Sequence, residues 1–130
     1  MRDRVSRFED LDVYKTAYQL QQCVFAMSRE WPKGERFSLT DQIRRSSRSV
    51  GASIAEAWAK RRYEAHFVSK LTDADGEANE TRHWLRTALD CGYIERPAYD
   101  DCLECCLHVG AMIGSMVAGA SRWAQRTRKP

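Results

Sequence analysis

Hydrophobic residues recur every three or four positions through most of the chain, which is the spacing of helices with one buried face. Four segments with this spacing lie at about residues 8–31, 38–60, 63–91 and 97–123, separated by turn residues. No run of alternating β-branched residues indicates a strand. The pattern predicts an all-α fold, and the short connections favour an antiparallel up-down-up-down four-helix bundle.

The first three predicted helices each carry an apolar stripe that we expect to form the core. The stripes comprise Leu11, Tyr14, Ala17, Tyr18, Val24, Phe25 and Met27; Leu39, Ile43, Ser47, Val50, Ile54 and Trp58; and Phe67, Leu71, Ala74, Ala78, Thr81, Leu85 and Ala88. Turn chemistry predicts the helix ends: Trp31-Pro32-Lys33-Gly34 stops the first, Ser38 is a candidate N-cap for the second, and Gly92 follows the third.

The fourth predicted helix is apolar on nearly every side. Tyr99, Cys106, Ile113 and Ala120 recur every seven residues, and positions 105–121 carry no formal charge. Because a helix apolar all round needs burial all round, we expect it to meet other subunits as well as its own bundle. Four small residues would let a second helix approach closely and form the predicted oligomer interface: Ala111, Gly114, Ser115 and Ala118.

A membrane span is the competing interpretation of that helix. A span needs about 20 strongly apolar residues, whereas this run includes His108, serines and three glycines. We therefore predict no membrane association. Residues 1–130 have the length of one domain, at 15.0 kDa. Five cysteines, an odd number, follow a charged N-terminal stretch without an apolar leader, so we expect a reducing cytoplasmic location.

The net charge of +3 conceals a segregated pattern. Residues 1–62 carry 13 basic and 8 acidic groups, residues 63–104 carry 4 and 10, and residues 105–130 carry 4 and none. Such segregation serves an external polyanion or is matched between neighbouring helices. The basic candidates for nucleic-acid contact are Arg44, Arg45 and Arg48 on one predicted helix face, and Lys60, Arg61 and Arg62 at the end of that helix.

Further basic groups stand near the C-terminus, and assembly into an oligomer would multiply all of these groups into larger patches. They are Arg122, Arg126, Arg128 and Lys129. Trp58 and Tyr63 flank the cluster Lys60–Arg62 and are candidates for stacking on bases, although Trp58 also belongs to an apolar stripe.

Two patterns invite a metal-site interpretation, and both fall short. Glu80 and His83 have the Glu-x-x-His spacing of di-iron bundles, but a second such pair is absent. Cys102, Cys105 and Cys106 precede His108, which points away from Cys106 on a helix, so four convergent zinc ligands are not expected. We predict no metal, no cofactor and no catalytic residues, because no nucleophile, phosphate loop or metalloprotease motif occurs.

Five short motifs carry a resemblance to a known family between about Phe8 and Ala120. They are Phe8-Glu-Asp-Leu11, Leu39-Thr-Asp-Gln-Ile-Arg-Arg45, Ile54-Ala-Glu56 with Trp58 and the basic turn, Gly76 with Glu80, and Gly92-Tyr-Ile94. With these, the chain resembles the bacterial four-helix-bundle family encoded in intervening sequences of large ribosomal RNA genes. Ser53, Ala57 and Glu77 depart from residues common in that family.

The resemblance implies an up-down bundle that assembles as a ring-like homopentamer. It also implies kinship to the accessory protein of diversity-generating retroelements, a basic pentameric barrel that binds nucleic acid and a reverse transcriptase. We therefore hypothesise a non-enzymatic homo-oligomeric scaffold that binds RNA or DNA through its arginines. The alternative is a protein-interaction scaffold without a nucleic-acid role, whose arginines pair with Asp73, Glu77 and Glu80.

Overall fold

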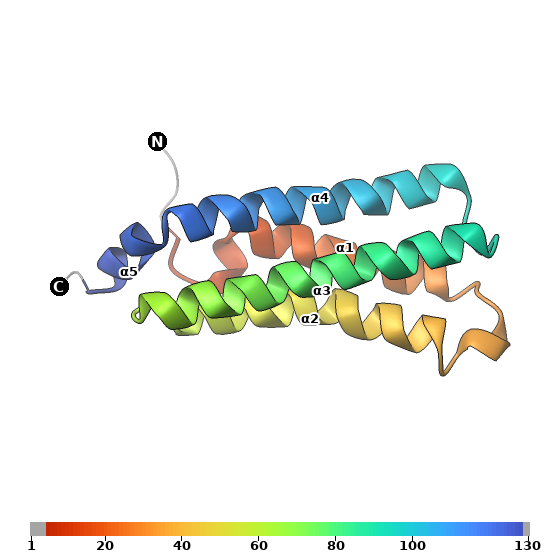
Figure 1. Ribbon diagram of the computed structural model, residues 1–130, viewed down its shortest axis with the longest axis horizontal. Helices are drawn as coiled ribbons and strands as arrows, with labels where there is room; N and C mark the ends of the chain where they lie inside the picture. The colour runs from red at the N-terminus through yellow and green to blue at the C-terminus, as the bar shows by residue number, and fades with distance from the viewer. Residues whose placement is uncertain (1–4, 129–130) are drawn as a thin grey trace.

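A computed structural model describes residues 5–128 of the chain, with side chains through Ala124 (Figure 1). Two short 3-10 helices, η1 (Phe8–Asp10) and η2 (Lys33–Glu35), accompany five α-helices. These are α1 (Asp12–Ser28), α2 (Leu39–Ala59), α3 (Glu64–Asp90), α4 (Arg96–Ala118) and α5 (Ala120–Arg128). Within the described residues there is no strand, and the all-α prediction is confirmed.

The four long helices lie side by side (Figure 1). Helix α3 packs against both α2 and α4, and α1 packs against α2 and α4. In Figure 1 the α1–α2 and α3–α4 connections lie at one end of the molecule, while the α2–α3 turn lies at the other end, near α5. The predicted bounds of the second and third helices differ from the observed ones by one residue at each end.

The first predicted helix, 8–31, is shorter than expected and divided. Leu11 has extended backbone angles (φ −70°, ψ 131°) and separates η1 from α1. The carboxylate of Asp10 accepts hydrogen bonds from the backbone N–H groups of Ser6 and Arg7, both at 3.1 Å, and so closes a local turn before α1 begins. At the other end α1 stops at Ser28, ahead of the turn that contains Pro32.

The fourth predicted helix, 97–123, is interrupted at Gly119, which separates α4 from α5. Gly119 has non-helical angles (φ −100°, ψ 20°), and glycine is a weak helix former. The break lets Trp123 of α5 pack edge-on against Trp58, with ring centroids 6.0 Å apart, and near Phe67 at 6.4 Å. Aromatic packing at the end of the bundle accompanies the interruption of the helix.

Ser38 occupies the N-cap position of α2, as predicted, but its side chain makes no capping hydrogen bond there. Its hydroxyl instead donates to the Glu35 carboxylate at 2.6 Å, and that carboxylate also accepts a 2.7 Å bond from the Tyr93 hydroxyl. These hydrogen bonds, from Ser38 first and Tyr93 second, lower the pKa of Glu35. Glu35 therefore ties η2 to the segment between α3 and α4.

The core consists of two apolar clusters, each supplied by all four long helices. One includes Val50, Phe67 and Ile113, and the other includes Leu20, Ile43 and Leu85. The whole predicted stripe of the third helix, from Phe67 to Ala88, is buried. The first stripe was only partly correct, because Tyr18 and Phe25 are exposed.

Buried hydroxyls lie between the two clusters. Ser46 on α2 and Thr81 on α3 share a 2.9 Å hydrogen bond, and neither side chain is exposed. Thr81 donates to the Glu77 carbonyl of its own helix at 2.9 Å, so the Ser46 hydroxyl, which lies 3.3 Å from the Ile43 carbonyl, is the donor available to Thr81. In sequence, Ser46 falls between Ile43 and Val50, and Thr81 falls between Ala78 and Leu85. Each hydroxyl therefore lies between a residue of one apolar cluster and a residue of the other.

Helix α4 is long and apolar enough to cross a membrane by length and composition alone, with a mean hydropathy of 1.3 over its best 18 residues. Five of its residues are buried inside the bundle instead: Cys102, Cys106, Val109, Ile113 and Met116. Because the core helix of a soluble protein passes the same test, the helix is weak evidence for a membrane.

Candidate nucleic-acid interface

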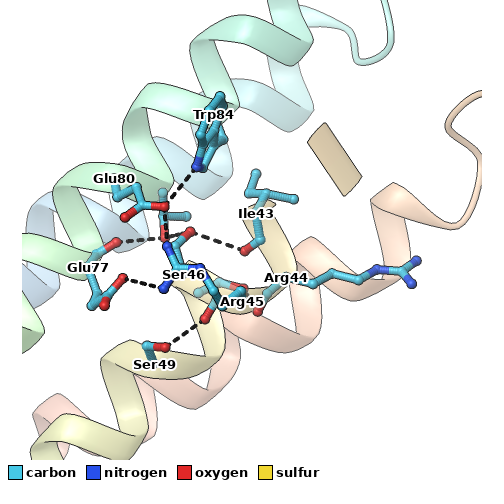
Figure 2. A network of polar contacts seen from close by, with 10 residues as sticks. Ile43, Arg44, Arg45, Ser46, Ser49, Glu77, Glu80 and Trp84 are labelled. Atoms are coloured by element: carbon cyan, nitrogen blue, oxygen red, sulfur yellow. Dashed lines mark hydrogen bonds and ion pairs between the residues drawn. The ribbon is translucent and has the colours of Figure 1, made fainter. Parts of the chain in front are cut away.

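The arginines of α2 were predicted to share one face, and the structure separates them. Successive residues of a helix are about 100° apart, so Arg44 and Arg45 reach different neighbours. Figure 2 shows the Arg44 side chain extending away from the network that surrounds Arg45. Arg44 and Arg48, four positions apart, share a face toward α1, whereas Arg45 faces α3.

Arg45 is held by acidic residues of α3 (Figure 2). Its guanidinium forms ion pairs with Glu80 and, at 3.4 Å, with Glu77. Glu80 also accepts a 3.1 Å hydrogen bond from the indole of Trp84. The Trp84 bond first, and Arg45 second, lower the pKa of Glu80, while Glu80 raises the pKa of Arg45. Of the six predicted contact residues, Arg45 is therefore matched internally.

Arg44 and Arg48 instead surround an aromatic ring of α1. Their guanidinium carbons lie 4.8 and 5.7 Å from the centroid of the Phe25 ring, and that of Arg29 lies at 5.9 Å. Arg44 also donates from Nε to the hydroxyl of Ser28 at 2.8 Å. Within the described residues, none of these three arginines is ion-paired with a carboxylate.

The second predicted cluster, Lys60, Arg61 and Arg62, lies at the other end of α2. Arg61 packs over the Trp58 ring, 3.6 Å from its centroid, and donates a 2.7 Å bond to the Trp58 carbonyl. Burial lowers the pKa of Arg61. Its guanidinium thus satisfies a terminal carbonyl of α2 and covers Trp58, while Lys60 and Arg62 are exposed.

A second cation, Lys70, also pairs with an acidic residue of α3. Lys70 lies 3.6 Å from Glu56 of α2 and 3.7 Å from Asp73 on its own helix. Asp73 was expected to pair with an arginine and pairs with Lys70. Internal matching therefore accounts for Arg45 and Lys70, and it leaves the Phe25 patch, defined as Arg29, Arg44 and Arg48 around Phe25, without a carboxylate partner.

All four residues of the predicted oligomer interface are exposed: Ala111, Gly114, Ser115 and Ala118. Leu107 lies one helical turn before Ala111 and is 50% exposed. A Cβ added at Gly114 would meet no atom within 4 Å. This uncharged face of α4 is thus exposed in the described part of the chain and offers room for a close-packed neighbour at Gly114.

The candidate metal ligands do not converge. Among the residues that the structure describes, no three His, Cys, Asp or Glu side chains form a group able to hold a metal ion. Cys102 lies 2.9 Å from Cys23 of α1, sulfur to sulfur. Glu80 is engaged by Arg45 and Trp84, and the exposed His83 ring packs edge-on against Trp84 at 4.7 Å.

Only part of the predicted C-terminal basic group lies among the residues that the structure describes. Arg122 is exposed, while the side chains of Arg126 and Arg128, and all of Lys129, lie outside the described part of the structure. Sequence reasoning missed Phe25 and Arg29 as site residues. The positive charge around the Trp31-Pro32 turn was the available signal, since Arg29, Lys33 and Arg36 follow one another there.

The sequence profile of the 23S rRNA-intervening sequence protein family matches residues 9–115, which is most of the chain. The chain belongs to this family. Among solved structures, this chain is similar to a protein of unknown function from the S23 ribosomal protein family of Bacteroides thetaiotaomicron. The two are 28% identical, the match covers 81% of this chain and 97% of the other, and the TM-score is 0.72. No curated protein is similar enough to match.

The five motifs predicted membership of the 23S rRNA-intervening sequence family, and the family match confirms that part of the resemblance. The matched region contains all six predicted nucleic-acid contacts and three of the four interface residues, Ala111, Gly114 and Ser115. The kinship to a retroelement accessory protein is a further expectation that rests on the resemblance alone.

Proposed function

We propose that this chain is a non-enzymatic, cytoplasmic scaffold that binds nucleic acid through the Phe25 patch. The observation that carries the proposal is the gathering of three guanidinium groups at one half-exposed ring without a carboxylate partner. Unpaired guanidinium groups suit phosphate oxygens, and an accessible aromatic ring suits a base. Nucleic acid offers both chemical groups along its length.

Assembly is the second part of the proposal. The subunit is an up-down-up-down four-helix bundle, and copies associate through Ala111, Gly114, Ser115 and Ala118 into a ring-like homopentamer. The exposed, uncharged face of α4 supports self-association, and the number five comes from the family resemblance. Repetition around a ring presents several Phe25 patches to one polyanion, which raises avidity without a strong single site. A reverse transcriptase as protein partner follows from the resemblance only.

Fluorescence anisotropy with a labelled single-stranded RNA, measured at several salt concentrations, tests the nucleic-acid part. We expect binding at low salt that weakens steeply as salt rises, because binding releases counterions. Arg29→Gln with Arg48→Gln should weaken affinity at least about tenfold at low salt. The matched control, Arg86→Gln with Arg96→Gln, removes the same charge from arginines paired with Asp90 and Asp100 and should retain affinity. Absence of binding by the unaltered protein at low salt overturns the proposal.

A protein-interaction scaffold without a nucleic-acid role is the second candidate. The ion pairs of Arg45 with Glu77 and Glu80, and of Lys70 with Glu56 and Asp73, favour it because they neutralise charge between α2 and α3. If this candidate is correct, removing charge at the Phe25 patch changes assembly or melting temperature, and RNA affinity is absent throughout. Multi-angle light scattering on the same variants separates the two candidates.

A further inference from the structure

A basic cleft lies where the end of α1, η2 and the start of α2 meet. It encloses about 400 Å³. Its lining consists of Ser28, Arg29, Trp31, Pro32, Lys33, Arg36, Thr40 and Arg44. Two of these residues, Arg29 and Arg44, also belong to the Phe25 patch, so the cleft and the patch are continuous.

Positive charge in this cleft is unmatched. Four of the eight lining residues are basic and none is acidic. Within the described residues, none of the four basic side chains forms an ion pair. Glu35 is adjacent in sequence, but it is not a lining residue, and its carboxylate contacts Ser38 and Tyr93. Four cations at one concavity, none of them ion-paired within the described residues, favour an anionic ligand.

Three further lining residues are more than nine-tenths buried and carry polar atoms. Ser28 is 3% exposed, Trp31 6% and Thr40 7%. The Ser28 hydroxyl accepts from Arg44 and donates to the Phe25 carbonyl, so it holds the Arg44 guanidinium in place. The indole N–H of Trp31 is the one buried side-chain polar atom, among those described, that has no hydrogen-bond partner. The Ser28–Arg44 bond therefore gives the cleft one guanidinium that a buried side chain holds in place.

An exposed aromatic ring adjoins the cleft. Phe37 is 87% exposed, the highest value among the exposed large hydrophobic side chains described. The guanidinium of Arg36, a lining residue, lies 5.7 Å from the centroid of that ring. A basic cleft beside an accessible aromatic ring has the chemistry of a single-strand binding site, in which the backbone follows cations and a base stacks.

We propose that this cleft binds a backbone phosphate of single-stranded nucleic acid, and that Phe37 stacks on a neighbouring base. The inference rests on the proposed function and assigns it a specific phosphate site. Lys33 and Arg36 supply the outer cations, while Arg44, fixed by Ser28, supplies the inner one. A duplex holds its bases in the stack, so the site favours an unpaired strand.

The first test compares two double variants in anisotropy titrations with single-stranded RNA. Lys33→Ala with Arg36→Ala removes two cleft cations, and Lys15→Ala with Arg82→Ala removes equal charge from exposed positions elsewhere. We expect the cleft variant to lose at least about tenfold in affinity, and its log–log salt slope to fall by about 0.7 for each lost phosphate contact. The control should stay within about twofold of the unaltered protein.

The second test concerns stacking. Phe37→Ala should weaken RNA binding roughly fivefold or more, as expected for loss of one stacked base. Tyr63→Ala removes another exposed aromatic ring, 59% exposed, beside Lys60–Arg62 at the far end of α2, and should have no effect. A loss of affinity in Tyr63→Ala with no loss in Phe37→Ala overturns the inference, because it places the strand at the other end.

A spectroscopic readout reports on the cleft directly. The chain has four tryptophans, so 5-fluorotryptophan labelling gives four fluorine signals, and Trp31→Phe identifies the one from the cleft. Addition of single-stranded RNA should shift the Trp31 signal, and inorganic phosphate should shift it only at far higher concentration.

The outcomes separate the two proposals. If RNA binds the unaltered protein and the cleft double variant equally well, the proposed function survives and this inference is overturned. If no RNA binds the unaltered protein, both fail. If inorganic phosphate alone shifts the Trp31 signal and RNA does not, the cleft serves a free anion and the assignment to nucleic acid is overturned.

Discussion

Arg45 of α2 and Glu80 of α3 form an ion pair in which the same carboxylate also accepts a hydrogen bond from Trp84. The neighbouring Arg44 has no such partner and faces α1 instead. Helix α2 therefore carries two adjacent arginines of different kinds: Arg45 joins α2 to α3, and Arg44 is available for a ligand. The two residues are expected to differ in what their substitution changes.

Arg45→Ala should lower the free energy of unfolding by about 0.5–1 kcal/mol, the range of a partly exposed ion pair, and the loss should shrink in high salt. The side chains of Arg45 and Glu80 are 47% and 34% exposed, so solvent screening keeps the effect small. RNA affinity should remain unchanged. Urea denaturation of Arg45→Ala, Glu80→Gln and the double variant measures the coupling, and strictly additive losses would contradict it.

Acid stability should depend on Glu80. Hydrogen bonds from Trp84 and Arg45 hold its pKa below the ordinary value of 4.5 in the folded chain. A carboxyl with a depressed folded pKa stabilises the fold above its unfolded pKa, and that contribution is lost as pH falls through the folded value. Melting curves below pH 4.5 should therefore fall less steeply for Glu80→Gln than for the unaltered protein. Parallel curves would show that Glu80 does not contribute.

Gly114→Gln should disrupt assembly without unfolding the subunit. A side chain at Gly114 meets nothing within its own chain, but it would separate two close-packed helices. Light scattering should report a single 15.0 kDa subunit for the variant and a larger particle for the unaltered protein. Ala52→Gln, a similar change at an exposed position of α2, is the control and should leave the assembly intact.

Gly76→Ala should raise the free energy of unfolding by about 0.5–1 kcal/mol, because alanine restricts the unfolded chain and favours the helix. Gly76 lies exposed inside α3, and a Cβ there would meet nothing within 4 Å. Urea denaturation measures the gain. If the variant loses stability or dissociates, a neighbouring subunit contacts α3 at this glycine.

Cys23 should be unusually reactive near neutral pH. A hydrogen bond with the Cys102 thiol, 2.9 Å away from sulfur to sulfur, lowers the pKa of Cys23 to about 7. Burial raises the pKa of Cys106 to about 12, so that thiol should stay protonated. Alkylation of Cys23 by iodoacetamide, followed site by site by mass spectrometry, should be half-maximal near pH 7. Cys102→Ala should move the midpoint upward, and an unchanged midpoint would contradict the assignment.

The helices could be predicted from sequence because apolar spacing is a local property. For α3 the predicted stripe was buried at every position from Phe67 to Ala88. The break at Gly119 was missed, and the packing of Trp123 against Trp58 that accompanies it joins residues far apart in sequence. Phe25 fitted the apolar stripe of the first helix and is nevertheless 36% exposed, with Arg29, Arg44 and Arg48 around its ring instead of core residues.

The candidate site was less predictable than the fold. Counting charges selected Arg44, Arg45 and Arg48 together, although the 100° step of a helix already separates Arg44 from Arg45. Which of them meets an acid depends on the rotation of α2 against α3, and a single sequence does not contain that angle. The basic cleft depends on the closure of the α1–α2 connection, which brings Arg29 and Arg44 to one concavity.

The hydroxyl pair of Ser46 and Thr81 fixes how far α2 and α3 can slide along each other. Displacement by one helical turn would move each hydroxyl against an apolar side chain of the opposite helix, with the bond between them broken in a dry interior. Apolar clusters alone tolerate such a shift, since one aliphatic layer resembles the next. Two small polar side chains thereby hold a single alignment along the length of the bundle.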